Sequence, residues 1–151
     1  KKSKLRKMAA RTGKLEQVAA LPYRLGRQGI EILVVTSRRT KRLVIPKGWP
    51  MPGIAHAAAA AIEANEEAGV KGEIADKPIG SFEYMKDLGG DAIRVEASVF
   101  PLKVRKVKSS WKERKQRRRI WMPVEQAVRK LDDAGLRSLV RATLRQLSSA
   151  V

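Results

Sequence analysis

Three glutamates lie within one short segment of the chain: Glu63, Glu66 and Glu67. If this segment is an α-helix, their spacing of i, i+3 and i+4 places the carboxylates within an arc of about 100°. Like charges at this spacing repel and destabilise a helix by about 0.2–0.5 kcal/mol per pair, so a compensating cation is expected. Hard divalent cations prefer carboxylate oxygens, and the spacing therefore predicts a site for an ion such as Mg²⁺.

The segment that carries the glutamates has the composition of a helix. Almost every residue over 55–68 favours helix, and Gly69 follows where a C-terminal cap is expected. His56 lies near the predicted helix start and is interpreted as a capping or surface residue. A second stripe of small side chains predicts a narrow face that packs closely against a sheet: Ala57, Ala61, Ala64 and Ala68.

Composition narrows the chemistry that this chain can perform. Its 151 residues suit one compact domain, and the 33 Lys and Arg against 15 Asp and Glu give a formal net charge of +18. The expected partner is therefore strongly anionic, with phosphate as the obvious group. The absence of cysteine excludes disulfides and thiolate chemistry, and a single histidine excludes a multi-histidine metal site.

The remaining elements alternate between strand and helix patterns. A first ordered element is expected at 17–23, and strands are expected at 30–36, 43–45, 72–84, 92–107 and 120–122. Prolines and glycines over 46–53 predict a loop of fixed shape, and 109–119 reads as irregular. A helix is expected to start at Pro123, followed by a last helix over about 136–147. We therefore predict a basic N-terminal tail over 1–16 and a folded domain over 17–151.

A specific resemblance appears over Gly48 to Val70. This stretch resembles the Nudix box, Gx5Ex7REUxEExGU with U aliphatic, through the residues Gly48, Glu63, Ala64, Glu66, Glu67, Gly69 and Val70. Ile54 and Ile62 replace the first Glu and the Arg of the box, which suggests that an apolar contact has replaced a polar one. The flanking sequence is similar to the diphosphoinositol polyphosphate and diadenosine polyphosphate phosphohydrolase branch. The segment Pro46 to Met51 looks like a bacterial subgroup of it.

The resemblance implies a fold and a set of site residues. The fold is α+β, a Nudix α-β-α sandwich in which a mixed β-sheet carries the glutamate helix on one side and the C-terminal helices on the other. Glu63 and Glu67 would be the principal metal ligands, joined by the backbone carbonyl of Lys47, with Mg²⁺ or Mn²⁺ as the ion. Glu66 would be a further ligand or the water-orienting base, so the candidate catalytic residues are Glu66 and Glu63. Glu83 and Glu96 are possible extra carboxylates.

Arginines supply the candidate contacts to substrate phosphate, since their planar guanidinium groups donate in pairs to phosphate oxygens. One set precedes the box loop and the other ends a run, Lys103 to Arg119, that holds ten basic residues and one acidic residue. The candidate substrate-binding residues are Arg38, Arg39, Arg42, Arg117 and Arg119. The run could equally be a solubilising loop, or an RNA contact in which Trp111 stacks on a base. Trp49 could stack on a ligand or pack in its loop.

These observations predict a metal-dependent hydrolase of a pyrophosphate bond in a highly phosphorylated small molecule, of the diphosphoinositol or diadenosine polyphosphate type. Two alternatives stay open: an RNA 5′ pyrophosphohydrolase, and a non-catalytic module that binds polyphosphate or RNA. No apolar run is long enough to span a membrane, so no membrane partner is expected. A cytoplasmic protein is the simple expectation, with a transit-like N-terminal segment as a lesser alternative. The oligomeric state stays open.

Overall fold

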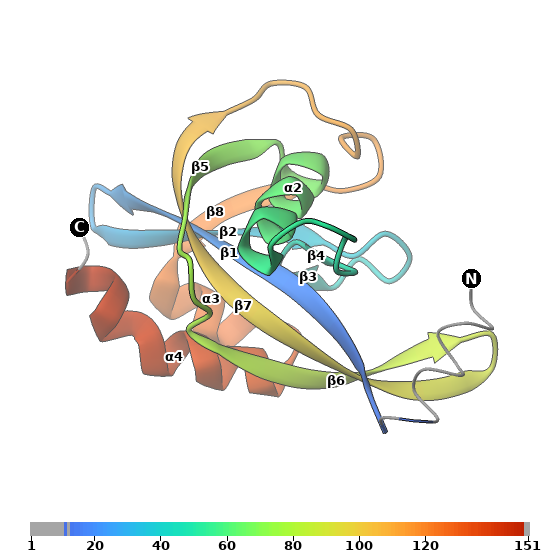
Figure 1. Ribbon diagram of the computed structural model, residues 1–151. Helices are drawn as coiled ribbons and strands as arrows, with labels where there is room; N and C mark the ends of the chain where they lie inside the picture. The colour runs from blue at the N-terminus through green and yellow to red at the C-terminus, as the bar shows by residue number, and fades with distance from the viewer. Residues whose placement is uncertain (1–10, 12, 150–151) are drawn as a thin grey trace.

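Strands dominate the architecture of the computed structural model, which describes residue 11 and residues 13–149 (Figure 1). They join in one eight-stranded sheet. The strands are β1 (Leu15–Gly26), β2 (Gly29–Thr36), β3 (Leu43–Val44), β4 (Lys47–Gly48), β5 (Val70–Ile74), β6 (Gly80–Leu88), β7 (Asp91–Val107) and β8 (Arg119–Pro123). β1 and β7 run parallel along the middle of the sheet, and the other pairs are antiparallel, so the sheet is mixed.

Helices cover both faces of this sheet. Helix α2 (His56–Ala68) lies on one face, and helices α3 (Val124–Lys130) and α4 (Ala134–Ser149) lie on the other (Figure 1). The predicted α-β-α sandwich of the α+β class is therefore confirmed. No helix in the described part of the chain combines the length and apolar character needed to cross a membrane.

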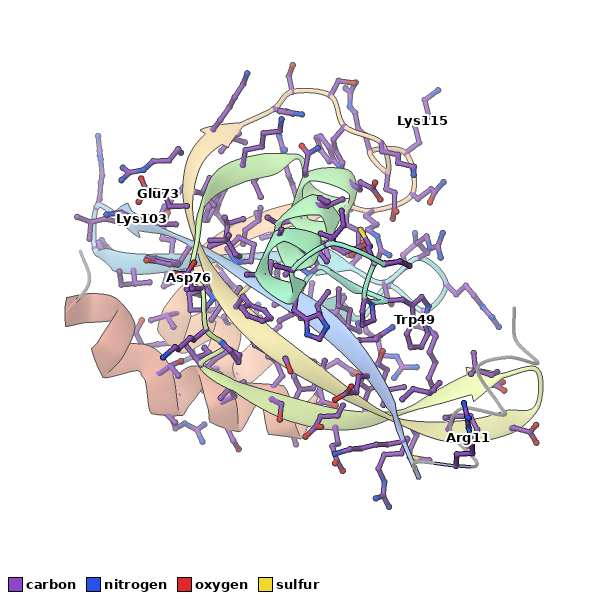
Figure 2. The ribbon with its side chains drawn as sticks, in the orientation of Figure 1. Arg11, Trp49, Glu73, Asp76, Lys103 and Lys115 are labelled. Atoms are coloured by element: carbon purple, nitrogen blue, oxygen red, sulfur yellow. The ribbon has the colours of Figure 1, made fainter. Side chains whose placement is uncertain are left out.

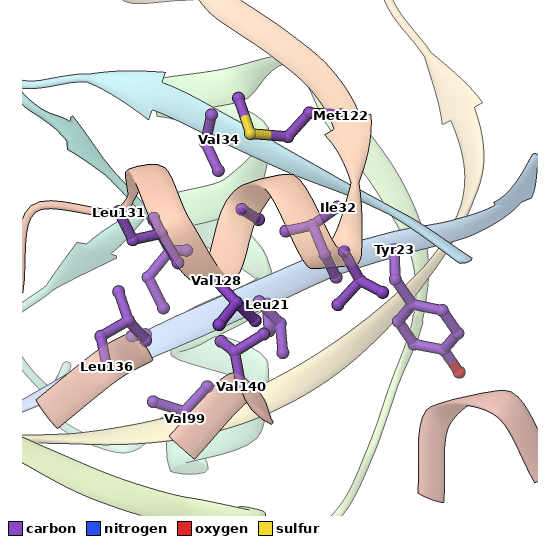
Figure 3. Close-up of a cluster of buried hydrophobic side chains, with 14 of the residues drawn as sticks. Leu21, Tyr23, Ile32, Val34, Val99, Met122, Val128, Leu131, Leu136 and Val140 are labelled. Carbon is purple, nitrogen blue, oxygen red and sulfur yellow. The ribbon is translucent and has the colours of Figure 1, made fainter. Parts of the chain in front are cut away.

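Alternating side chains on the central strands build two hydrophobic cores. On β1, Val18 and Ala20 face α2, whereas Ala19 and Leu21 face α3 and α4. This is the period of two that a strand buried on both faces requires. Figure 3 shows the larger core, where Leu21 and strand residues from β2 and β7 meet Val128, Leu136 and Val140 of the helices.

Helix α2 starts and ends as its sequence predicts. Gly69 caps its C-terminus in the left-handed conformation, with φ of 66°. The buried alanines differ partly from the predicted stripe, because Ala59 and Ala60 are fully buried whereas Ala57 and Ala61 are half-buried. The helix is thus rotated slightly relative to the prediction, and this rotation carries Glu67 into the interior.

Several boundaries differ from those expected, and the three largest differences are as follows. The predicted strand over 72–84 is two strands, because both β5 and β6 pair with β7 and the intervening 75–79 segment contains Pro78, which lacks an amide donor. The two-residue strand β4 forms inside the predicted loop by pairing with β1. β1 begins at Leu15, two residues before the expected start of the domain, and residues 1–10 and 12 of the predicted tail lie outside the described residues.

Candidate active site

Glu63 and Glu67 face a cleft of about 740 Å³ between α2, the 37–42 loop, β6 and the 108–118 segment. One helical turn separates the two glutamates, so their side chains project in the same direction. The backbone N–H of Lys47, on β4, donates to Oε1 of Glu67 at 3.3 Å. Strand β4 therefore anchors the glutamate face of the helix beside the central strand β1.

The two carboxyl groups form a hydrogen-bonded pair with unusual protonation. Glu67 is only 5% exposed, and this burial, together with the neighbouring Glu63 carboxyl, raises the pKa of Glu67 to about 8. Burial also raises the pKa of Glu63, although its hydrogen bond with Glu67 opposes that increase. The buried Glu67 and the half-buried Glu63 both resist ionisation and form a hard-oxygen donor set, and a divalent cation would neutralise both.

Glu66 lies outside this pair. Its carboxylate is 3.7 Å from Nζ of Lys112, and it does not line the cleft. In the described part of the chain, no three His, Cys, Asp or Glu side chains gather closely enough to enclose a metal ion. The structure thus brings together two of the three predicted carboxylates. The way α2 packs against the sheet directs Glu66 away from the cleft and toward Lys112.

Cationic side chains form the wall opposite the glutamates. Nη2 of Arg117 lies 3.7 Å from Oε1 of Glu67, and its side chain is only 11% exposed. Lys47 and Lys86 line the same cleft, and burial lowers the pKa of both amino groups. Nζ of Lys47 also lies 5.2 Å from the centre of the Tyr84 ring. An anion that replaced solvent here would meet partly buried positive charge beside the carboxylate pair.

Glu113 is a cleft residue that the sequence interpretation missed. It accepts a hydrogen bond of 2.7 Å from Nε of Arg117, and both side chains line the cleft. Its charge also contributes to the raised pKa values of Glu63 and Glu67. The signal was present in the sequence, because Glu113 is the single acidic residue in the run from Lys103 to Arg119.

The segment that carries Glu113 is fastened to the C-terminal end of α2. The backbone N–H of Glu113 donates to the carbonyl of Glu66, and Nε1 of Trp111 donates to the carbonyl of Glu67 at 3.1 Å. Arg119 donates to the carbonyls of Ala68 and Lys108, and its guanidinium stacks on Trp111 at 3.8 Å. These donors satisfy carbonyls that a helix end leaves free.

The predicted substrate-binding arginines are therefore distributed over three places. Arg38, Arg39 and Arg117 line the cleft. Arg42 lines an adjoining cavity of about 550 Å³, where it pairs with Asp132 at 3.1 Å. Arg119 is occupied at the end of α2 and is not brought to the cleft.

The other candidate residues lie at the edge of the cleft or away from it. Trp49 lines the cleft and also packs against a small apolar cluster around Leu15 and Val95. Glu83 and Glu96 are register partners on β6 and β7, where they pair with Arg94 and Lys14 respectively. Neither of these two glutamates lines the cleft.

Comparison with known proteins adds an evolutionary relationship to this geometry. No family model matches the chain. Nudix hydrolase 17, mitochondrial, of Arabidopsis thaliana is 30% identical over 145 residues, which cover 91% of this chain and 78% of that protein. Nudix hydrolase 18, mitochondrial, of the same plant is 32% identical over 76% of this chain and 68% of its own length. The chain belongs to the Nudix hydrolase family.

Further relatives agree with this Nudix assignment. Diphosphoinositol polyphosphate phosphohydrolase 3-beta of Bos taurus is 31% identical over 77% of this chain and 68% of that protein. A solved C. elegans Ap4A hydrolase has a TM-score of 0.64 at 22% identity, over 89% of this chain and 98% of that one. The MutT protein of Methanosarcina mazei matches with the same TM-score and identity. These two structures support the fold.

The structure explains why the first residue of the Nudix box, Gly48, is a glycine. A Cβ atom built on Gly48 would lie 2.5 and 2.6 Å from the two carboxylate oxygens of Glu63. Only a residue without a side chain leaves room for Glu63 to sit beside β4. Ile54, in contrast, is 39% exposed, and neither it nor Ile62 belongs to a buried cluster of the described residues. The apolar contact predicted from these two substitutions finds no support in this packing.

The raised pKa of Glu67 predicts how the stability of this Nudix domain depends on pH. Between the usual pKa of 4.5 and about 8, the folded chain keeps a proton that the unfolded chain releases. The free energy of unfolding should therefore fall as the pH rises through that window, by up to about 1.4 kcal/mol per unit, and level off above it. Thermal unfolding with a chelator present measures this slope. The same slope in Glu67→Gln would contradict its assignment to Glu67.

Proposed function

We propose that this chain hydrolyses a pyrophosphate linkage in a dinucleoside polyphosphate, with Mg²⁺ held by Glu63 and Glu67. The observation that carries the proposal is the pair formed by the buried Glu67 and the half-buried Glu63, which faces the cationic wall of Lys47, Lys86 and Arg117 across the cleft. Nudix hydrolases generally use divalent metal ions, and the oxygen donors of this pair suit Mg²⁺ or Mn²⁺. The carbonyl of Lys47, on the strand whose amide contacts Glu67, is the further ligand that we propose.

Each part of the cleft has a chemical role in this proposal. The bound ion would neutralise charge on the phosphate oxygens and make water more acidic. Arg117 and Lys86 hold the phosphates by charge-assisted hydrogen bonds, while the buried surroundings strengthen those contacts. We assign proton acceptance from the attacking water to Glu63 rather than Glu66, because the Glu66 carboxylate pairs with Lys112 outside the cleft.

The adjoining cavity favours a nucleoside over a fully phosphorylated ring. It shares Lys47, Tyr84 and Lys86 with the cleft, so a substrate can extend from one into the other. Its walls combine the stacked rings of Phe82 and Tyr84 with three carboxylates, which are Asp87, Asp132 and Asp133. An aromatic base can pack against these rings, whereas a phosphorylated inositol ring has no aromatic face to do so. The cations Arg39 and Arg42 in the same lining can contact the phosphates that adjoin the base.

A turnover assay with Mg²⁺ over a set of substrates tests this proposal. The set contains diadenosine polyphosphates, diphosphoinositol polyphosphates, nucleoside triphosphates and RNA with a 5′ triphosphate. We expect the largest kcat/KM for a diadenosine polyphosphate and a lower value for a diphosphoinositol. The reverse order would reject the nucleoside assignment and retain the chemistry. Tight binding without turnover across the whole set would instead indicate a binding module.

A further inference from the structure

Lysines and arginines that do not line the cleft gather near the C-terminal end of α2 and along the 108–118 segment. Lys71 on β5 and Lys106 on β7 are register partners, and Lys108 adjoins them. Arg114, Lys115 and Arg118 are exposed on the 108–118 segment, which follows Lys108 in the chain. Figure 2 shows Lys115 projecting away from α2. We call the six residues Lys71, Lys106, Lys108, Arg114, Lys115 and Arg118 the outer basic band.

Hydrogen bonds connect the two halves of this band. The backbone N–H of Lys108 donates to the carbonyl of Gly69, the residue before β5. Arg119 donates to the carbonyl of Lys108. Burial lowers the pKa of Arg119, and the nearby charge of Arg114 lowers it further. Lys108, Arg119 and Arg114 are therefore successive neighbours in space at the end of α2, between β5 and the 108–118 segment.

Acidic side chains do not neutralise the outer basic band. Among the described residues, none of its six members has a carboxylate oxygen within 4.0 Å. Desolvation lowers the pKa of Lys108, and the neighbouring charges of Lys71 and Lys106 lower it further. Unpaired like charges held together in this way repel one another, and a bound polyanion removes that cost.

We infer that the outer basic band binds single-stranded RNA through its phosphate backbone. A flexible strand can follow a curved segment of this kind, and its successive phosphates match a row of cations. Trp111 is half-buried between Arg119 and Gly69, so the row would hold the strand by charge rather than by stacking. A membrane surface fits less well, because Val107 is the one large apolar side chain exposed beside the band among the described residues. The binding is separate from catalysis, since the cleft lies on the inner side of the segment.

Fluorescence anisotropy with a 5′-hydroxyl oligouridylate of about 12 nucleotides tests this inference. The probe contains no pyrophosphate, so the result does not depend on the proposed hydrolysis. Six phosphate contacts predict a slope of log affinity against log salt near −4, which is a loss of about 300-fold between about 50 and 200 mM salt. A slope shallower than about −1 would overturn the inference.

Matched variants locate the binding surface. Replacing Lys71, Lys106 and Lys108 together by Gln should bring the slope to about −2. The control replaces Arg129, Lys130 and Arg141 by Gln, which removes the same charge from exposed positions on α3 and α4, across the sheet from α2. The control should leave the slope near −4. Equal weakening by both variants would assign the affinity to net charge alone and would overturn the inference. Binding to phosphatidylserine vesicles without binding to RNA would also overturn it.

Discussion

Replacing Glu67 by Gln should reduce kcat/KM for the pyrophosphate substrate by at least about 100-fold. The loss of a residue that supports a metal ligand typically costs about 10–100-fold, and Glu67 is proposed to be a ligand itself. The amide keeps the size of the side chain and its acceptor for the Lys47 N–H, so the domain should still fold. Steady-state kinetics, with isothermal titration of Mg²⁺ alone, measure both the chemical and the metal-binding loss.

Glu31→Gln provides the matched control for this result. Glu31 is also an ion-paired glutamate, bonded to Arg24 at 2.7 Å, but it lies on β2 away from the cleft. The control should retain activity within about twofold, because a surface ion pair contributes at most about 1 kcal/mol to stability. If Glu67→Gln kept wild-type kcat/KM, the metal site and the proposed function would both be wrong.

Replacing Gly48 by Ala should remove most activity while leaving the fold intact. The new Cβ would overlap the Glu63 carboxylate, and that group is the end of a flexible side chain that can rotate away. The movement costs the protein little stability but separates Glu63 from Glu67. We expect kcat to fall by about 100-fold or more, since misplacement of a reacting group by about 1 Å can cost this much. Kinetics and thermal unfolding together separate the two effects.

Gly26→Ala is the corresponding change outside the cleft. A Cβ on Gly26 would meet the Glu31 carboxyl carbon at 2.5 Å, which is the same kind of collision with a flexible glutamate. Its effect on activity should be small. Should Gly48→Ala prove as active as Gly26→Ala, the position of Glu63 beside β4 would not matter for catalysis.

Local sequence predicted the elements that form through short-range preferences. The run of alanines and Gly69 predicted α2 almost to the residue, because helix propensity and a glycine cap act within a few positions. The strand over 72–84 was predicted less well. Its division into β5 and β6 depends on how two separate stretches pair with the long strand β7, which is information held far away in the chain.

The candidate site was predicted in part for a similar reason. The spacing of Glu63 and Glu67 fixed their common direction, so their meeting could be expected. The separation of Glu66 depends on the rotation of α2 against the sheet, which its local pattern did not determine. Arg119 was expected in the cleft and lies at the end of α2, whereas Glu113 was not expected in the cleft and lines it. Both positions follow from the hydrogen bonds by which Trp111 and Arg119 fasten the 108–118 segment to α2, and no periodicity in that basic run indicates such contacts.

The hydrogen bonds between the 108–118 segment and α2 affect which amino-acid substitutions the protein tolerates. Glu113, Trp111 and Arg119 all donate to main-chain carbonyls of the helix rather than to its side chains. Every amino acid offers the same carbonyl, so substitutions along the helix surface leave this attachment in place. The outer residues of the helix are therefore free to vary, whereas Trp111 and Arg119, which donate from their side chains, are constrained by their own hydrogen-bonding groups.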